Sequence, residues 1–150
     1  MSGEHTDLPA RRRLAPEVRH RVMASIRKKD TRPELALRAA LREAGLVGYR
    51  VHASDLPGTP DVAFRRWKVA IFVDGVFWHG RPDYFQFGTK GPYWDQKIAR
   101  NMARDATVAT DLTALGWLAL RFWDVDVLAA PGVISGKIGR ALARRGRRAA

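Results

Sequence analysis

The segment Lys68–Val73 constrains the fold more than any other part of this chain, because it ends in five consecutive apolar residues, VAIFV. Uninterrupted apolar runs of this kind are typical of central strands that are covered on both faces. A helical pattern over Tyr93–Leu115 follows, stops at Gly116 and leads into a second strand-like segment, Trp117–Trp123. A strand, a crossover helix and a second strand imply a parallel pair, so we expect an α/β fold.

Two further strands complete the predicted sheet, which is a mixed β-sheet flanked by helices. Asp61–Phe64 is separated from Lys68–Val73 by a short polar break, which predicts an antiparallel hairpin. Tyr49–His52 is the remaining strand. Start and stop signals predict the other helices at Val18–Lys28, from Thr31 to Gly45, and at Val127–Ala143 with a break at Pro131 and Gly132.

The helix that follows Thr31 carries a capping signal beside an acidic residue. The Thr31 hydroxyl can cap the first turn while Glu34 completes a capping box. Leu37, Leu41 and Ala44 form the expected inward stripe. Glu34 lies within about a quarter turn of that stripe, close to the protein interior.

A chain of 150 residues with 46% hydrophobic content is long enough for one compact domain with a core. We place this domain at residues 17–143. Residues 1–16 and 144–150 carry clustered arginines without apolar periodicity, so we expect a flexible basic N-terminal arm and a basic C-terminal tail. Either end can equally be a solvated terminus with no binding role.

Charge and cysteine content narrow the classes of function. The net charge of +12 favours a polyanionic partner, with nucleic acid ahead of the alternative of a merely basic protein. The absence of Cys excludes disulfides, thiolate nucleophiles and Cys-type zinc sites, so any metal must sit on oxygen or imidazole. No segment resembles a membrane helix or a secretory signal, and we therefore expect a soluble, cytoplasmic protein.

Two carboxylates and a carbonyl are expected to meet at one end of the hairpin. Asp61 begins one strand and Asp74 directly follows the next, so pairing brings both side chains beside the carbonyl of Val73. Mg²⁺ prefers such oxygen ligands, and phosphodiester cleavage needs a divalent ion to neutralise developing charge. The sequence therefore predicts a metal site at Asp61, Asp74 and the main-chain oxygen of Val73.

His79 is a candidate base because it follows Asp74 by five residues and an imidazole titrates near neutral pH. A lone loop histidine more often has no such role. Asp105 strengthens the case, because it falls in the middle of the expected buried stripe of the long helix, where a carboxylate needs a partner. It can orient an imidazolium, or it can bond to a backbone amide or an arginine, and both readings remain open. The residues of that stripe are Ile98, Met102, Ala109 and Leu112.

The loop from Gly75 to Trp94 mixes aromatic residues with cations, a combination that suits base stacking and phosphate contact. For three of the aromatic residues, Tyr84, Phe85 and Phe87, we favour burial in the core over contact with nucleic acid. The others are Phe77, Trp78, Tyr93 and Trp94, and the cations are Arg81, Lys90 and Lys97.

Five ordered segments resemble the successive motifs of the very short patch repair (Vsr) endonuclease family: DTRPELALR, LPGTPDVAF, VAIFVDGVFWHG, YWDQKIARNMARD and LGWLALRFW. The resemblance covers the chain from about Arg21 to Val127 and implies a restriction-endonuclease-like fold. That family nicks one strand 5′ to the thymine of a T:G mismatch produced by deamination of 5-methylcytosine. The resemblance thus implies a Mg²⁺-dependent DNA mismatch endonuclease in very short patch repair.

The matching motifs also imply roles for the site residues. Asp61 is the principal metal-binding carboxylate and Val73 supplies a main-chain oxygen, with two Mg²⁺ ions possible and Mn²⁺ able to substitute. His79 is the base for water and Asp105 orients it, while Glu34 acts through metal-bound water. Asp74 stands where the family has either His or Asp, and it is a secondary candidate as a ligand.

Further implications of the resemblance concern DNA and protein partners. An aromatic wedge would enter the base stack beside the mismatch, where unstacking costs less, and a residue of the N-terminal arm would insert from the opposite groove. The wedge corresponds to Phe77, Trp78 and Trp94 and the arm residue to Met23, and we add Lys97 and Asn101 as predicted DNA contacts. We expect a monomer, with mismatch-repair proteins and a repair polymerase as partners.

One departure from the family pattern concerns zinc. The family commonly binds structural zinc through Cys and His, whereas this chain has Val76, Arg81, Asp83 and Val125 at those positions. We therefore expect no structural zinc and expect Val76 and Val125 to pack together instead. Two alternative functions remain: a protein that binds mismatched DNA without cutting it, and a nuclease of the same fold that acts on another lesion or site.

Overall fold

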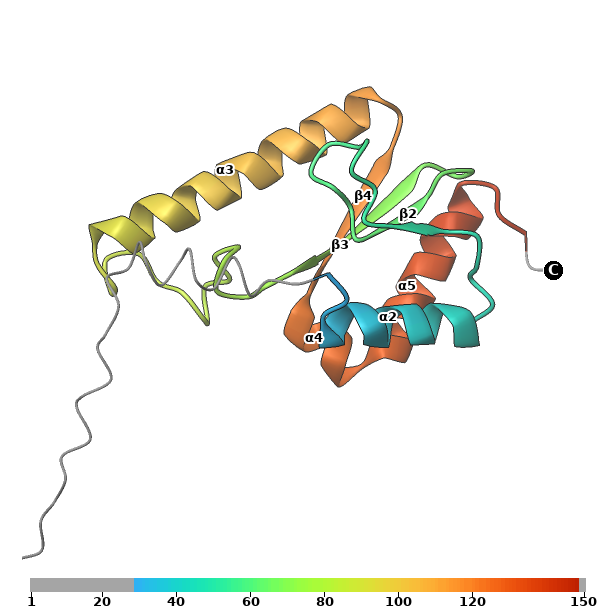
Figure 1. Cartoon of the computed structure of the whole chain (residues 1–150), viewed down its shortest axis with the longest axis horizontal. Coiled ribbons are helices and arrows are strands. Elements are labelled where there is room, and N and C mark those ends of the chain that lie inside the picture. The colour runs from blue at the N-terminus through green and yellow to red at the C-terminus, as the bar shows by residue number, and fades with distance from the viewer. Residues whose placement is uncertain (1–28, 149–150) are drawn as a thin grey trace, which may run out of the picture.

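The computed structural model describes residues 29–148, whose centre is a four-stranded sheet of order β1-β2-β3-β4 (Figure 1). The strands are β1 (Arg50–Val51), β2 (Val62–Phe64), β3 (Val69–Asp74) and β4 (Leu118–Trp123). The predicted arm 1–16, the predicted helix Val18–Lys28 and residues 149–150 lie outside the described range.

The pairing confirms the mixed sheet. β1 with β2 and β2 with β3 are antiparallel, whereas β3 and β4 are parallel, with Val69 opposite Leu118 and Asp74 opposite Trp123. The first strand is shorter than predicted, because only Arg50 and Val51 form ladder pairs. This arrangement confirms the α/β fold and is consistent with the restriction-endonuclease-like architecture.

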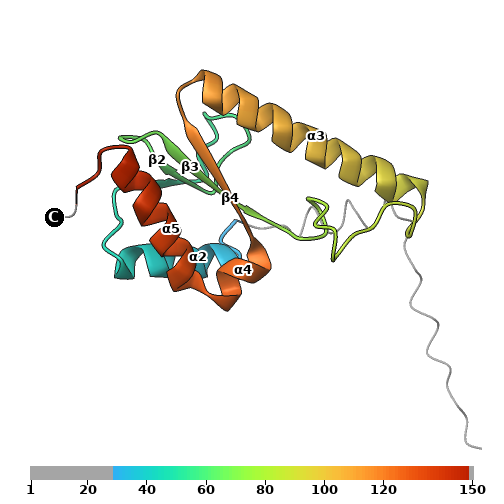
Figure 2. The same cartoon turned by 180° about the vertical axis from the view of Figure 1, so that it is seen from behind.

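Helices cover both faces of the sheet. The crossover helix α3 (Pro92–Ala114) lies on one face, and α2 (Arg32–Glu43), α4 (Asp124–Ala129) and α5 (Pro131–Arg144) lie on the other (Figures 1 and 2). The N-terminal half of α3 extends past the end of the sheet, and the loop of residues 75–91 runs beside it in both views. None of these helices is long and apolar enough to span a membrane.

The alternation of side chains along β2 and β3 divides the core into two parts. Val62, Phe64, Val69 and Ile71 pack with residues of α2, α4 and α5. The intervening Ala63, Ala70 and Phe72 face Val108 and Leu112 of α3. Successive strand residues point to opposite faces, so both alanines face α3. Because their side chains are small, α3 can approach the sheet closely.

The α2 predictions are confirmed at the end of the helix and wrong in two details. Gly45 adopts φ +71°, and the Leu46 N–H donates to the Leu41 carbonyl, which closes the helix in a Schellman arrangement.

Thr31 makes no side-chain cap, and Glu34 instead accepts the backbone N–H of Asp30. The buried stripe contains Ala40 with Leu37 and Leu41, while Ala44 is exposed at the C-cap.

The predicted stripe of the long helix also needs a correction. Met102 is 42% exposed, and Val108 is buried instead. The interior face follows Trp94, Ile98, Val108 and Leu112, with Asp105 half-buried along it. Met102 falls off this face because the stripe advances by alternating steps of four and three residues, at the 3.6-residue helical period.

The C-terminal region forms two short helices rather than one interrupted helix from Val127. α4 begins at Asp124, and α5 begins at Pro131, whose fixed φ suits a first helical position. Within the segment 144–150 that we expected to be a tail, Arg145 Nη1 donates to Gly116 O and Arg147 Nη2 donates to Gly45 O. These cations lie against the carbonyl ends of α3 and α2.

Candidate active site

Three adjacent strands place charged groups in one row on the α3 face of the sheet. Asp61 comes one residue before Val62, which pairs with Ile71, so Asp61 lies level with Phe72. Phe72 pairs in turn with Arg121 on β4. Two residues farther along β3 than Phe72, Asp74 lies on the same face, because side chains alternate with a period of two.

Asp61 is a half-buried carboxylate without a cationic partner within ion-pair distance among the described residues. Its Oδ2 accepts the backbone N–H of Val73 at 2.7 Å. Burial, together with the negative charges of Glu34 and Asp74, raises the pKa of Asp61 to about 6, against the opposing effects of the Val73 N–H and His52. Such a group gains from a bound cation, which would compensate for its lost hydration.

His79 contacts Asp105, which is one of the two partners that the sequence left open for this carboxylate and the one that the family resemblance implies. The Nδ1 of His79 lies 2.5 Å from Asp105 Oδ2, so an ionised Asp105 accepts the Nδ1 proton. This leaves Nε2 unprotonated in the neutral ring and 3.7 Å from Asp74 Oδ1. The loop and α3 therefore present the imidazole with the tautomer that a general base requires.

Asp74 is paired with Arg121. Arg121 Nη1 donates to both carboxylate oxygens of Asp74, at 3.0 and 3.2 Å, and lies 3.5 Å from Asp105 Oδ1. The guanidinium also stacks over Phe72, 4.1 Å from the ring centroid. Burial raises the pKa of Asp74, while the charges of His79 and Arg121 oppose that rise. Asp105 therefore has both partners that the sequence left open, an imidazole and an arginine.

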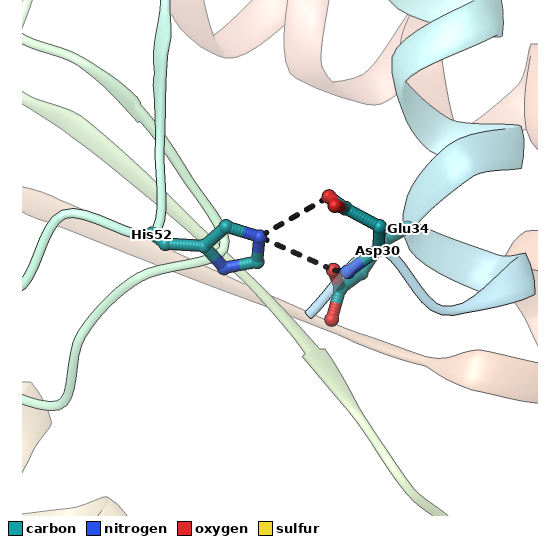
Figure 3. Close-up of side chains that lie close together, drawn as sticks. All are labelled: Asp30, Glu34 and His52. Carbon is teal, nitrogen blue, oxygen red and sulfur yellow. Dashed lines mark hydrogen bonds and ion pairs between the residues drawn. The ribbon is translucent and has the colours of Figure 1, made fainter. Parts of the chain in front are cut away.

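Glu34 belongs to a second cluster, drawn in Figure 3, at the start of α2. His52 Nε2 lies between Glu34 Oε2 and Asp30 Oδ1, at 3.7 and 3.4 Å. Arg38 contacts both carboxylates, at 2.5 Å from Asp30 and 3.8 Å from Glu34. The backbone N–H of His52 donates to the carbonyl of Asp61, so this cluster lies next to the predicted metal site.

A single cleft joins these groups. Its lining contains every predicted catalytic and metal-binding residue: Glu34, Asp61, Val73, Asp74, His79 and Asp105. It also contains His52, Arg104 and Arg121. Segments that are far apart in sequence thus bring carboxylates, an imidazole and cations to one end of the sheet.

The donor chemistry of the cleft fits a divalent metal ion. Two groups each bring three potential ligand atoms within 4.8 Å of one another, namely Asp30 with Glu34 and His52, and Asp74 with His79 and Asp105. Carboxylate oxygens predominate, which suits Mg²⁺ or Mn²⁺, and the uncompensated Asp61 lines the same cleft.

The aromatic loop packs largely on itself and on α3. Phe77 meets Trp78, Phe85 and Trp94 edge-on at centroid distances of 5.2 to 5.5 Å, and Trp94 is 7% exposed. Of the three aromatics for which we favoured burial, Phe85 confirms the prediction. It is wrong for Tyr84 and Phe87, which are 49% and 55% exposed, because both project from the loop. The wedge role of Phe77, Trp78 and Trp94 stays a prediction.

The other predicted DNA contacts have different surroundings. Asn101 Nδ2 donates to the Trp78 carbonyl at 2.9 Å, so its amide fixes the aromatic loop on α3. Lys97 is half-buried one turn earlier on the same helix. Met23 lies outside the described residues. Contact of these residues with DNA stays a prediction.

An arginine connects the positions where the family pattern has zinc ligands. Arg81 lies 2.9 Å from Asp83 and 3.5 Å from Asp126 of α4, and its guanidinium lies 5.8 Å from the Trp123 ring centroid. These contacts link the loop to the end of β4. Val76 and Val125 are both half-buried, and their mutual packing stays a prediction.

Sequence reasoning missed Arg121 and His52, two cleft residues that contact predicted site residues. Arg121 interrupts the apolar pattern of LGWLALRFW, and a charge within a strand that pairs with an acidic strand end was the available signal. His52 had no comparable signal, because its partners Asp30 and Glu34 belong to another element.

Comparison with known proteins places the chain among DNA endonucleases. The family model described as DNA mismatch endonuclease Vsr matches residues 12–84. Type II nicking enzyme V.HpaIIP of Haemophilus parainfluenzae is 42% identical over 137 residues, which is 89% of this chain and 96% of that protein. DNA mismatch endonuclease Vsr of Escherichia coli K12 is 35% identical over 108 residues, covering 71% of this chain and 69% of that protein.

A further relative has the same type of name. Type II nicking enzyme V.NmeDIP of Neisseria meningitidis serogroup C is 41% identical over 133 residues. The match covers 87% of this chain and 89% of that protein.

Proposed function

This chain belongs to the Vsr family of DNA endonucleases, and we propose that it nicks one strand of a duplex 5′ to the thymine of a T:G mismatch. Endonuclease activity follows from the family. The choice of a mismatched substrate is supported by the relative from Escherichia coli, which is named a DNA mismatch endonuclease. The observation that carries the chemistry is the His79–Asp105 pair, which lines the same cleft as Asp61.

We further propose Mg²⁺ as the cofactor, with Mn²⁺ able to replace it. Asp61 and the Val73 carbonyl would hold the ion, and its charge would stabilise the negative charge that develops on the phosphate. The carboxylate of Asp61 supports this assignment, because no described Lys or Arg pairs with it and its pKa is raised to about 6, so a bound cation would stabilise its charged form.

The remaining residues divide the work of hydrolysis. His79 Nε2 accepts a proton from the attacking water, and Asp105 holds the ring through Nδ1 and stabilises the imidazolium that forms. Glu34 lines the cleft beside His52 and would order water near the phosphate. A positioned base of this kind contributes about 10²–10⁴-fold to a rate.

DNA recognition would use the aromatic loop and the positive charge of the chain. Phe77 and Trp78 are half-buried, and Trp78 contributes to the lining of the cleft, which would place an inserted aromatic ring beside the site of cleavage. A mismatch lowers the cost of unstacking and thereby favours insertion at that step. Cytoplasmic location, the monomeric state and repair-protein partners stay predictions.

The test is to map cleavage on end-labelled duplexes in Mg²⁺. One set carries T:G, another each remaining mismatch, and a third no mismatch. We expect a single nick 5′ to the mismatched thymine, and Asp61→Ala should abolish it while largely preserving binding of the mismatched duplex.

Two results would contradict the proposal in different ways. Equal nicking of every duplex, or of an unmismatched site, would favour the second candidate, a nuclease of the same fold with another target. Unchanged activity of Asp61→Ala would exclude the metal assignment.

A further inference from the structure

The three acidic groups in and beside the cleft differ in whether they already have a cationic partner. The cluster of Asp30 and Glu34 holds the guanidinium of Arg38, and the cluster of Asp74 and Asp105 holds that of Arg121. In the part of the chain that the structure describes, Asp61 has no ion-pair partner. Each group that could collect three ligands for a metal ion thus already contains one arginine, which offsets one of its two carboxylate charges.

Three contacts fix the position of the Arg121 side chain. It bonds to Asp74, lies 3.5 Å from Asp105 and stacks on Phe72, and these groups come from β3 and α3. The in-register pairing of Phe72 with Arg121 sets the root of the side chain. A divalent ion placed among Asp74, His79 and Asp105 would be repelled by the positive charge of this guanidinium. It would also compete with the guanidinium for the same carboxylate oxygens.

We propose that Arg121 takes the place of a second metal ion, so that the cleft binds one divalent ion, at Asp61. This proposal rests on the metal-dependent cleavage proposed above and states how many metal ions each chain binds. Arg121 is then a positioning residue, which holds Asp74 away from metal and lies beside the Asp105 carboxylate that contacts His79. Its Nε and Nη2 form no hydrogen bond or ion pair within the described residues and can donate to a phosphate oxygen.

Titration calorimetry with Mn²⁺ on the intact, metal-free protein tests this directly, without any DNA. We expect about one ion per chain for the wild type. Arg121→Met should free Asp74, His79 and Asp105 and add a second binding event. The double variant Asp74→Asn with Arg121→Met should return to one ion, because the freed carboxylate is then absent.

Arg65→Met is the matched control, because Arg65 forms a two-point bond with Asp55 outside the cleft, at 2.8 and 2.6 Å. It removes an equal charge and an equivalent Arg–Asp pair, and its stoichiometry should stay at one. Nicking by Arg121→Met should fall by about 100-fold at low Mg²⁺ and recover in part at high Mg²⁺, when a second ion fills the space. Nicking by Arg65→Met should stay near the wild-type rate.

Two ions bound by the wild type would overturn the proposal, and so would a folded Arg121→Met that binds only one. If Arg121→Met fails to fold, Arg121→Lys keeps the charge and must bind one ion. The metal titration does not depend on the substrate. A protein that binds one ion but does not nick T:G duplexes would therefore refute the proposed function and leave this inference standing.

Discussion

At Asp61, burial and metal binding favour opposite protonation states of the carboxyl group. Burial favours the protonated acid and raises its pKa to about 6, whereas a metal ion needs the carboxylate. The folded protein therefore holds this carboxylate in a state that a divalent ion would stabilise. The same residue sets a pH limit for metal binding.

Metal affinity should fall with acidity below pH 6. The folded pKa of Asp61 lies above its ordinary value of 3.8, so protons compete with the metal as pH drops through 6, and affinity falls by about tenfold per pH unit. In the metal-free protein this raised pKa has the opposite consequence. Its contribution to stability is complete below 3.8 and is lost as pH rises through 6.

Mn²⁺ titrations between pH 5 and pH 7.5 would measure the effect, with Asp61→Asn as the control that lacks the titrating group. An affinity that stays constant across this range would show that Asp61 is not the ligand.

Asp105→Asn should slow nicking by about 100-fold or more and leave DNA affinity unchanged. A neutral amide can donate to Nδ1 and so select the tautomer with a proton on Nε2, which cannot accept another from water. Single-turnover rates and fluorescence anisotropy with labelled duplex would separate the two quantities. Asp111→Asn, an exposed change on the same helix, should have little effect on either.

Among the structural elements, the loop 75–91 sets the position of His79, because it carries this residue and packs against α3. Asn101 bonds to Trp78, and Gly80 lies so close to α3 that a Cβ there would stand 2.8 Å from Met102 Sδ and 2.9 Å from Ile98 Cγ2. Gly80 also has φ +71°, a conformation that favours glycine. The loop can therefore place His79 only where α3 supports it.

Gly80→Ala should destabilise the fold by about 2 kcal/mol or more, through strain and overpacking together. Because His79 is the preceding residue, nicking should fall at least tenfold. Gly88→Ala is a matched control, since Gly88 has φ +85° but no atom within 4 Å of a new Cβ. It should cost roughly 1 kcal/mol and keep the wild-type rate. Thermal melting and nicking assays would compare them, and equal effects of the two changes would contradict this role of Gly80.

For the whole molecule, the net charge of +12 predicts a strong electrostatic component of DNA binding. The logarithm of affinity should fall linearly with the logarithm of salt, by about 0.9 for each phosphate contacted. Anisotropy titrations over a series of NaCl concentrations would give this slope for T:G and fully paired duplexes. Because phosphate contacts do not read the mismatch, the two slopes should agree, and an affinity independent of salt would contradict the electrostatic reading.

The sequence by itself predicted the order of β2, β3 and β4 in the sheet, the C-terminal ends of α2 and α3, and the meeting of the acidic residues at one end of the sheet. The apolar run of β3, the short link to β2 and the glycines at 45 and 116 act locally, so their consequences can be read from neighbouring residues. The same is true of Asp61 and Asp74, because strand pairing alone brings both to one end of the sheet.

Only the tertiary structure decided how the charges are shared. His79 and Asp105 are 26 residues apart in sequence, and Asp74 and Arg121 are 47 apart, so their contacts depend on the position of α3 and on the β3–β4 register. Which aromatic side chains are buried was decided in the same way, by how the loop folds back on α3. Local patterns place residues on elements, but the free energy of a charge depends on every group packed around it.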